Sequence, residues 1–143
     1  MKIGIVGTGN IAFRHLEEFN KIDNIKVEAV CDTNKDNLEK FLSLNNKYKI
    51  RGYTNLDEML SNEKNFDGIT NATPDKFHKE TSIKVLNSGY NIFCEKPLAE
   101  NYEDAKKMVE AAVSAKKINM VNFTYRESSA YQKLVDIIKS GDV

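Results

Sequence analysis

The sequence predicts a doubly wound α/β domain, in which about six parallel strands form one sheet with helices on both faces. Short apolar runs typical of buried strands alternate along the chain with segments of helical periodicity, and this alternation predicts a parallel sheet. A glycine-rich turn follows the first expected strand, where a helix is expected to begin. The 143 residues suffice for one domain and no flexible linker interrupts them, so we expect residues 1–143 to form a single domain.

The expected strands are short and apolar, and turn residues separate them from the helices. Strands are expected at residues 2–6, 25–31, 49–53, 68–72, 91–94 and 118–123. Helices are expected at residues 11–21, 34–44, from 55 onward, 74–88, 102–116 and 131–139. Asn101 is expected to cap the fifth helix, and Gly89 to end the fourth in a left-handed conformation. The last helix is amphipathic and is expected to bury Leu134, Val135 and Ile138.

The charge balance argues against several classes of partner. The chain carries 21 basic and 21 acidic side chains with both signs scattered, so no basic face is expected for nucleic acid or an anionic membrane. We find no run of about 20 apolar residues that could cross a bilayer and no signal peptide. Cys31 and Cys94 lie inside strand-like runs, and no spacing suits a metal. We therefore expect a cytoplasmic protein with reduced thiols and no metal site.

The turn Gly-Thr-Gly-Asn-Ile-Ala after the first strand matches the dinucleotide-binding pattern G-x-G-x-x-G/A. Gly7 allows a tight turn, Gly9 lets a pyrophosphate approach the backbone, and Ala12 lets the helix pack closely on the sheet. The free amides of Asn10 and Ile11 are expected to face the phosphates from the helix N-terminus. The alternative is that the glycines only permit a tight turn.

Asp32 ends the second expected strand, at the position where a carboxylate can accept hydrogen bonds from the ribose hydroxyls of an adenosine. It would also repel a 2′-phosphate, and the following Thr33-Asn34-Lys35 contains no arginine to hold one. These features favour NAD, with NADP as the alternative cofactor. Asp32 could also, or instead, cap the helix that follows.

Ligands of open α/β sheets bind beyond the carboxyl ends of the strands, so residues that end the later strands are candidates. Lys96 follows a buried strand, and its amine can donate to a substrate hydroxyl or to the nicotinamide ribose. The alternative is an ion pair between Glu95 and Lys96. His78 is expected near the same edge, and two roles are open for it: binding of the cofactor, or ordinary packing in the interior. His15, inside the first helix, is interpreted as an ordinary packing or surface residue.

Several stretches of the chain resemble one family of oxidoreductases. They are the glycine turn, Ala72-Thr73-Pro74 with His78 after it, and Gly89-Tyr90-Asn91-Ile92-Phe93-Cys94 leading into Glu95-Lys96-Pro97-Leu98. Together with Asn122-Phe123-Thr124-Tyr125-Arg126, the pattern is similar to the glucose–fructose oxidoreductase, inositol dehydrogenase and MocA (Gfo/Idh/MocA) family over essentially the whole chain. The family often shows G-F-N-Y-R in the last stretch, and this chain departs from it there.

The resemblance implies a Rossmann domain of an NAD(P)-dependent oxidoreductase, which transfers hydride between nicotinamide and a sugar, polyol or related alcohol or ketone. The residues that it assigns to the cofactor are Gly7, Gly9, Asn10, Ile11, Asp32, Thr73, Pro74, His78, Glu95, Lys96 and Arg126. The first four would hold the pyrophosphate, and Asp32 the adenosine ribose. Lys96 would assist hydride and proton transfer at the nicotinamide end, and Arg126 would lie near the pocket at the domain junction.

In this family a C-terminal domain supplies most of the substrate pocket, the catalytic histidine and the oligomer interface, and we expect no counterpart of that domain within residues 1–143. The resemblance therefore implies the cofactor half of a homo-oligomeric enzyme, which alone binds a dinucleotide with little turnover. Two alternatives stay open: a free-standing dinucleotide-binding or redox-sensing module without catalysis, and a degenerate domain that only mediates assembly. Bare apolar surface around the last helix and strand would argue against the free-standing module.

Overall fold

Six parallel strands form the sheet of the computed structural model, which describes residues 1–141; residues 142 and 143 of the predicted domain lie outside the described residues. The strands are β1 (Lys2–Val6), β2 (Lys26–Cys31), β3 (Arg51–Tyr53), β4 (Gly68–Asn71), β5 (Ile92–Cys94) and β6 (Asn119–Val121). Every neighbouring pair is parallel, and the order across the sheet is β3-β2-β1-β4-β5-β6. This order confirms the predicted fold class.

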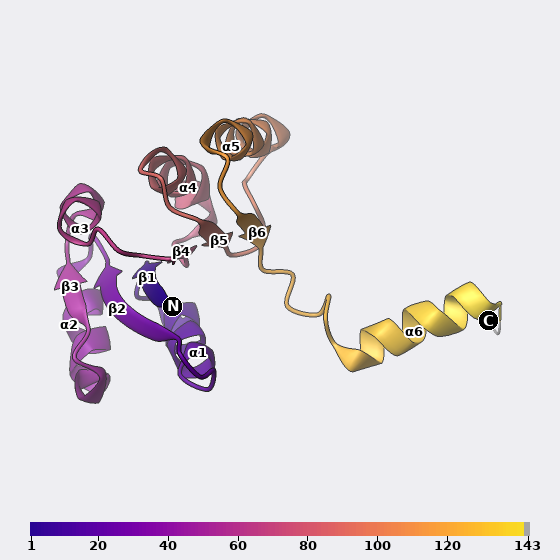
Figure 1. Ribbon diagram of the computed structural model, residues 1–143, viewed down its shortest axis with the longest axis horizontal. Coiled ribbons are helices and arrows are strands. Elements are labelled where there is room, and N and C mark those ends of the chain that lie inside the picture. The colour runs from indigo at the N-terminus through magenta and orange to yellow at the C-terminus, as the bar shows by residue number, and fades with distance from the viewer. Residues whose placement is uncertain (142–143) are drawn as a thin grey trace.

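Helices cover both faces of this sheet (Figure 1). They are α1 (Asn10–Phe19), α2 (Lys35–Leu44), α3 (Leu56–Asn62), α4 (His78–Asn87), α5 (Tyr102–Ala115) and α6 (Ser129–Ser140), with 3₁₀ turns η1 (Asn46–Tyr48) and η2 (Asp75–Phe77). On one face, α1 and α2 bury Ala12, Leu16, Leu38 and Phe41. On the other face, α3, α4 and α5 bury Met59, Val85, Leu86 and Ala112. The apolar stripes of these five helices thus complete two cores, one on each side of the sheet.

Two helix ends follow the predicted capping residues. The side chain of Asn101 accepts a backbone N–H from the first turn of α5, and Gly89 follows α4 in a left-handed conformation with φ +85°. Asn34, which was not predicted as a cap, accepts from the first turn of α2 in the same way. Pro74 differs from the expectation, because it precedes η2 and α4 begins only after that turn. The third strand begins later than expected, because Lys49 ends η1 with a left-handed φ of 54°.

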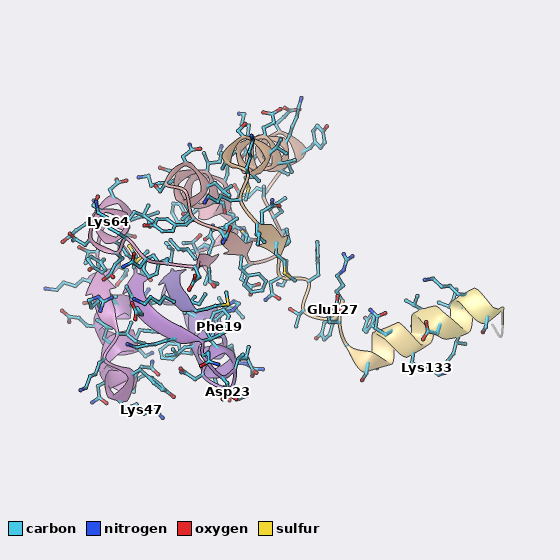
Figure 2. All side chains as sticks on the ribbon, in the orientation of Figure 1. Phe19, Asp23, Lys47, Lys64, Glu127 and Lys133 are labelled. Atoms are coloured by element: carbon cyan, nitrogen blue, oxygen red, sulfur yellow. The ribbon has the colours of Figure 1, made fainter. Side chains whose placement is uncertain are left out.

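The prediction that the last helix buries its apolar side is wrong. Leu134, Val135 and Ile138 are 50%, 38% and 59% exposed, because the segment after β6 leads α6 away from the sheet (Figure 1). Figure 2 shows Glu127 in this connecting segment and Lys133 on α6, both well apart from the sheet. Periodicity identifies an amphipathic helix but not the surface that covers it. Within residues 1–141, no helix combines the length and apolar character that a bilayer crossing requires.

Glu63 joins three parts of the fold at the end of α3. Its carboxylate accepts hydrogen bonds from the Arg51 guanidinium and, at 2.7 Å, from the Tyr53 hydroxyl, and its carbonyl oxygen accepts from the Tyr90 hydroxyl at 2.9 Å. The hydrogen bond from Arg51 lowers the pKa of Glu63, and burial opposes this shift without cancelling it. The ionised carboxylate of Glu63 therefore connects β3 with the end of α3, and the carbonyl oxygen of the same residue connects them with Tyr90, which lies just before β5.

We expect Glu63→Gln to lower the free energy of unfolding by about 1–2 kcal/mol at neutral pH, since the amide keeps the shape but weakens the charge-assisted hydrogen bonds. The pKa of Glu63 is lowered by folding, so its contribution is present above the unfolded pKa and lost as pH falls through the folded one. Urea unfolding of both proteins from about pH 7 to about pH 3 measures this difference. A difference that stays constant over this range would contradict the role of the charge.

Candidate functional site

A cleft of about 710 Å³ lies at the edge of the sheet where β1 to β4 end. Its wall includes six of the predicted cofactor residues, namely Gly7, Gly9, Ile11, Asp32, Thr73 and Pro74. The predicted residues after β5 and β6 do not line it. The cleft therefore extends from the glycine turn toward β2 and β3, on the side where an adenosine is expected.

The glycine turn leaves the N-terminus of α1 open to this cleft. Gly7 has φ +89°, and a Cβ there would lie 2.5 Å from the carbonyl oxygen of Ala72, so only glycine fits. A Cβ at Gly9 would instead meet nothing within 4 Å. No side chain caps α1, and its first turn carries no acidic residue. The exposed Asn10 and Ile11 thus offer backbone N–H groups at a helix N-terminus, which is favourable for an anion.

Asp32 links the end of β2 to the glycine turn. Its Oδ2 accepts hydrogen bonds from the backbone N–H and the hydroxyl of Thr8, both at 2.8 Å. Its Oδ1 accepts from the backbone N–H of Asn34 at 2.8 Å. The alternative role of Asp32 as helix cap is wrong, because the Asn34 side chain accepts from Asn37 at the start of α2. Asp32 remains partly exposed in the wall of the cleft.

The loop after β4 is held from behind by buried polar groups. Asn71 Oδ1 accepts from the Thr73 hydroxyl at 2.7 Å, and its Nδ2 donates to the Ser82 hydroxyl at 3.0 Å. His78 is fully buried, with Nε2 2.8 Å from the carbonyl oxygen of Thr73 and Nδ1 2.7 Å from that of Pro97. His78 therefore connects the loops after β4 and β5 and lies behind the cleft wall.

Glu95 and Lys96 have opposite environments at the end of β5. Glu95 is buried, and its Oε1 lies 2.8 Å from His15 Nε2 and 2.7 Å from Asn122 Nδ2. Lys96 is exposed, and its amine forms no hydrogen bond or ion pair with any residue of the described part of the chain. The alternative ion pair between Glu95 and Lys96 is therefore wrong, because His15 and Asn122 take up the carboxylate.

Arg126 lies outside this arrangement. It belongs to the segment between β6 and α6, and its side chain is 71% exposed, with Nε 3.8 Å from the Glu127 carboxylate. The same segment leads away from the sheet in Figure 1. Contact between Arg126 and a substrate pocket stays a prediction.

The wall of the cleft that lies beyond β3, at α3 and α4, was not predicted from the sequence. Residues 54–57 follow β3, and Phe77, Glu80, Thr81 and Lys84 come from η2 and α4. Lys84 Nζ lies 2.9 Å from Asp57 Oδ2, so an ion pair links α4 to α3 at this wall. Residues 54–57 could have been predicted as part of the cleft, because they directly follow an expected strand and all parallel strands have their carboxyl ends at the same edge.

The two cysteines have no reactive character. Both are buried, and neither forms a disulfide. Burial raises the pKa of each thiol to about 11, so both are protonated at neutral pH and are weak nucleophiles. Cys31 lines the cleft as an apolar wall residue. Across residues 1–141, no group of three His, Cys, Asp or Glu side chains could hold a metal ion.

Proteins with similar sequences are members of one oxidoreductase family. The sequence model of the Gfo/Idh/MocA oxidoreductase family, NAD-binding Rossmann fold, matches residues 1–123. Glucose-6-phosphate 3-dehydrogenase of Bacillus subtilis is 32% identical over 139 residues, which are 97% of this chain and 37% of that protein. Inositol 2-dehydrogenase of Salmonella typhimurium is 30% identical over 147 residues, covering 100% of this chain and 43% of that enzyme. The chain thus spans about two fifths of the length of these relatives.

Solved structures of similar fold also match this chain over almost its whole length and over about two fifths of their own length. The WlbA dehydrogenase of Bordetella pertussis, solved with NADH and UDP-GlcNAcA, has a TM-score of 0.89 and 29% identity, covering 98% of this chain and 42% of that one. Myo-inositol 2-dehydrogenase of Lactobacillus plantarum has a TM-score of 0.87 and 29% identity, covering 100% of this chain and 42% of that one. The chain therefore belongs to the Gfo/Idh/MocA oxidoreductase family and corresponds to its NAD-binding Rossmann domain.

Proposed function

We propose that this domain binds NAD along the carboxyl edge of its sheet, with the pyrophosphate at the glycine turn. The observation that carries the proposal is the uncapped N-terminus of α1, which opens on a cleft with Asp32 in its wall. The strand order places β2 on one side of β1 and β4 and β5 on the other. Asp32 would then hold the adenosine ribose, while Thr73, Pro74 and Lys96 would lie toward the nicotinamide.

The residues around the cleft fit this cofactor. The open space beside Gly9 leaves room for phosphate oxygens at the backbone, and the Asn10 and Ile11 amides would donate to them. The negative charge of Asp32 favours a ribose hydroxyl over a 2′-phosphate, and this supports NAD over NADP. A bound nicotinamide would supply the hydride donor or acceptor.

We further propose that the domain serves an oxidoreductase acting on a sugar, polyol or related alcohol or ketone. The named relatives act on inositol and glucose 6-phosphate, which supports this substrate class. The free amine of Lys96 could donate a hydrogen bond to the reacting oxygen of such a substrate, which is the catalytic role assigned to it. His78 would act on the cofactor through the Thr73 and Pro97 backbone.

Exposed apolar side chains favour a domain of a larger enzyme over a free-standing module. Five large apolar side chains near the end of the chain are at least half exposed, namely Ile118, Met120 and Phe123 in and around β6, and Leu134 and Ile138 on α6. Apolar surface of this kind is typical of a protein contact. A substrate domain and further copies of the enzyme are the partners that we propose for it. The two buried, unpaired cysteines support a reducing, cytoplasmic location.

The cofactor preference can be measured by titrating the 143-residue chain with NADH and NADPH, following their own fluorescence because the chain contains no tryptophan. We expect NADH to bind about 10-fold more tightly or better, since Asp32 repels a 2′-phosphate. Asp32→Asn keeps the shape of the side chain and removes its charge, so it should lower the ratio of the NADPH dissociation constant to the NADH dissociation constant about 10-fold. An unchanged ratio would mean that Asp32 does not face the ribose. Rapid turnover of polyols by this chain would contradict its role as a cofactor domain.

The two glycines of the turn give a matched pair of variants. Gly7→Ala should lower the free energy of unfolding by about 2–4 kcal/mol, because its Cβ meets the Ala72 backbone at a positive φ. Gly9→Ala should lower the free energy of unfolding by only about 1 kcal/mol or less, since the space around it is open and the cost is that of a poorer N-cap residue for α1. It should nevertheless weaken NADH binding about 10-fold or more, because the methyl group takes the place of a phosphate. Urea unfolding and NADH titration separate the two effects, and full NADH affinity in Gly9→Ala would argue against a phosphate site.

A further inference from the structure

A single buried carboxylate joins three elements at the nicotinamide side of the sheet. Glu95, at the end of β5, is 6% exposed and accepts from His15 Nε2 on α1 at 2.8 Å and from Asn122 Nδ2 after β6 at 2.7 Å. Its other oxygen accepts from the backbone N–H of Lys96 at 3.2 Å. The α1 helix that begins at the glycine turn is thus linked through one side chain to the backbone of Lys96.

Glu95 is held as a carboxylate in this position. Burial alone raises the pKa of Glu95, but the hydrogen bonds from Asn122, His15 and the Lys96 amide together outweigh burial and leave the pKa below its ordinary value. A carboxylate only accepts hydrogen bonds, so Nε2 of His15 is the donor in their contact. Without that donor, a buried negative charge would lose one of its hydrogen bonds.

The ring of His15 is fixed on its remaining sides. It stacks on Phe19 with a centroid distance of 5.9 Å and meets Phe93 edge-on at 5.8 Å. The side chain is buried, so the ring cannot turn away to water. Packing and hydrogen bonding together hold Nε2 toward Glu95.

Lys96 combines a fixed backbone with a free amine. On one side its N–H donates to Glu95, and on the other the carbonyl oxygen of Pro97 lies 2.7 Å from His78 Nδ1. Its own amine has no partner within residues 1–141. A fixed backbone places the Lys96 amine close to a defined position. It therefore lowers the entropy cost when the amine binds a ligand.

We propose that His15 is a positioning residue, which acts through Glu95 to fix the backbone of Lys96 so that its amine is presented to the nicotinamide half of the cofactor. The proposal rests on the proposed function, because it requires Lys96 to contact that half. It predicts that His15 and Lys96 are energetically coupled, although their side chains do not touch. A residue that only fills the core of α1 would not be coupled in this way.

The test compares NADH with ADP-ribose, which lacks the nicotinamide, by calorimetric titration of the 143-residue chain. We expect wild type to bind NADH more tightly than ADP-ribose, and Lys96→Met to remove that advantage. His15→Leu has a similar volume but no donor, and it should weaken NADH about 10-fold while changing ADP-ribose less than about 2-fold. His15→Gln is the matched control, because its amide can donate to Glu95 and should retain the advantage for NADH.

The double variant His15→Leu/Lys96→Met tests the coupling directly. If His15 acts through Lys96, the double variant binds NADH no more weakly than Lys96→Met alone. Additive losses, or equal weakening of NADH and ADP-ribose in His15→Leu, would overturn the proposal and leave His15 a structural residue. If circular dichroism shows that His15→Leu does not fold, His15→Met replaces it, since methionine fills irregular core space without a donor.

Failure of the proposed function gives a different result. If wild type binds neither NADH nor ADP-ribose, the dinucleotide site itself is wrong, and the positioning role is overturned with it. If wild type binds both with equal affinity and Lys96→Met has no effect, dinucleotide binding stands and the role of His15 alone is overturned.

Discussion

Parallel pairing throughout the sheet is the constraint on which the site depends. Because all six strands run the same way, their carboxyl ends and the loops that follow them meet at one edge. The chain moves outward in one direction from β1 to β3, and β4 returns to the other side of β1. Gly7 therefore lies at the middle of the edge, with Asp32 on one side and Thr73 and Lys96 on the other. A molecule with two unlike halves around a charged centre matches that arrangement.

Polar side chains at the strand ends give this edge its rigidity. Asp32 after β2 binds Thr8, Asn71 at the end of β4 binds Thr73, and Glu95 after β5 binds His15. The bonds of Asp32 and Glu95 connect a strand end to the glycine turn and to α1, and the bond of Asn71 holds the loop that directly follows its own strand. Buried polar groups with satisfied partners specify one arrangement of the backbone. The loops that would hold a ligand are therefore ordered before the ligand arrives, which lowers the entropy cost of binding.

The sequence predicts the parts of this structure that depend on local pattern. Alternating periodicity and the glycine turn were enough for the sheet, five packed helices and the position of Asp32, because each depends on residues close together in the chain. The partners of Glu95 could not be predicted, since His15 and Asn122 are 80 and 27 positions away and only the folded topology brings them together. The exposure of α6 was missed for a related reason, because a helical stripe predicts burial without identifying the partner.

The hydrogen bonds of Asp32 limit how an adenosine ribose could bind in the proposed mode. A carboxylate accepts about four hydrogen bonds, and Thr8 and Asn34 already supply three of them. Oδ1, with one bond from Asn34, has room for one ribose hydroxyl without losing any existing contact. A second hydroxyl would have to displace the Thr8 hydroxyl from Oδ2, while the Thr8 N–H bond could remain. In this proposed mode the Thr8 hydroxyl would compete with the ribose for the same carboxylate. The hydrogen bonds from the backbone N–H groups of Thr8 and Asn34 would keep Asp32 in place in either case.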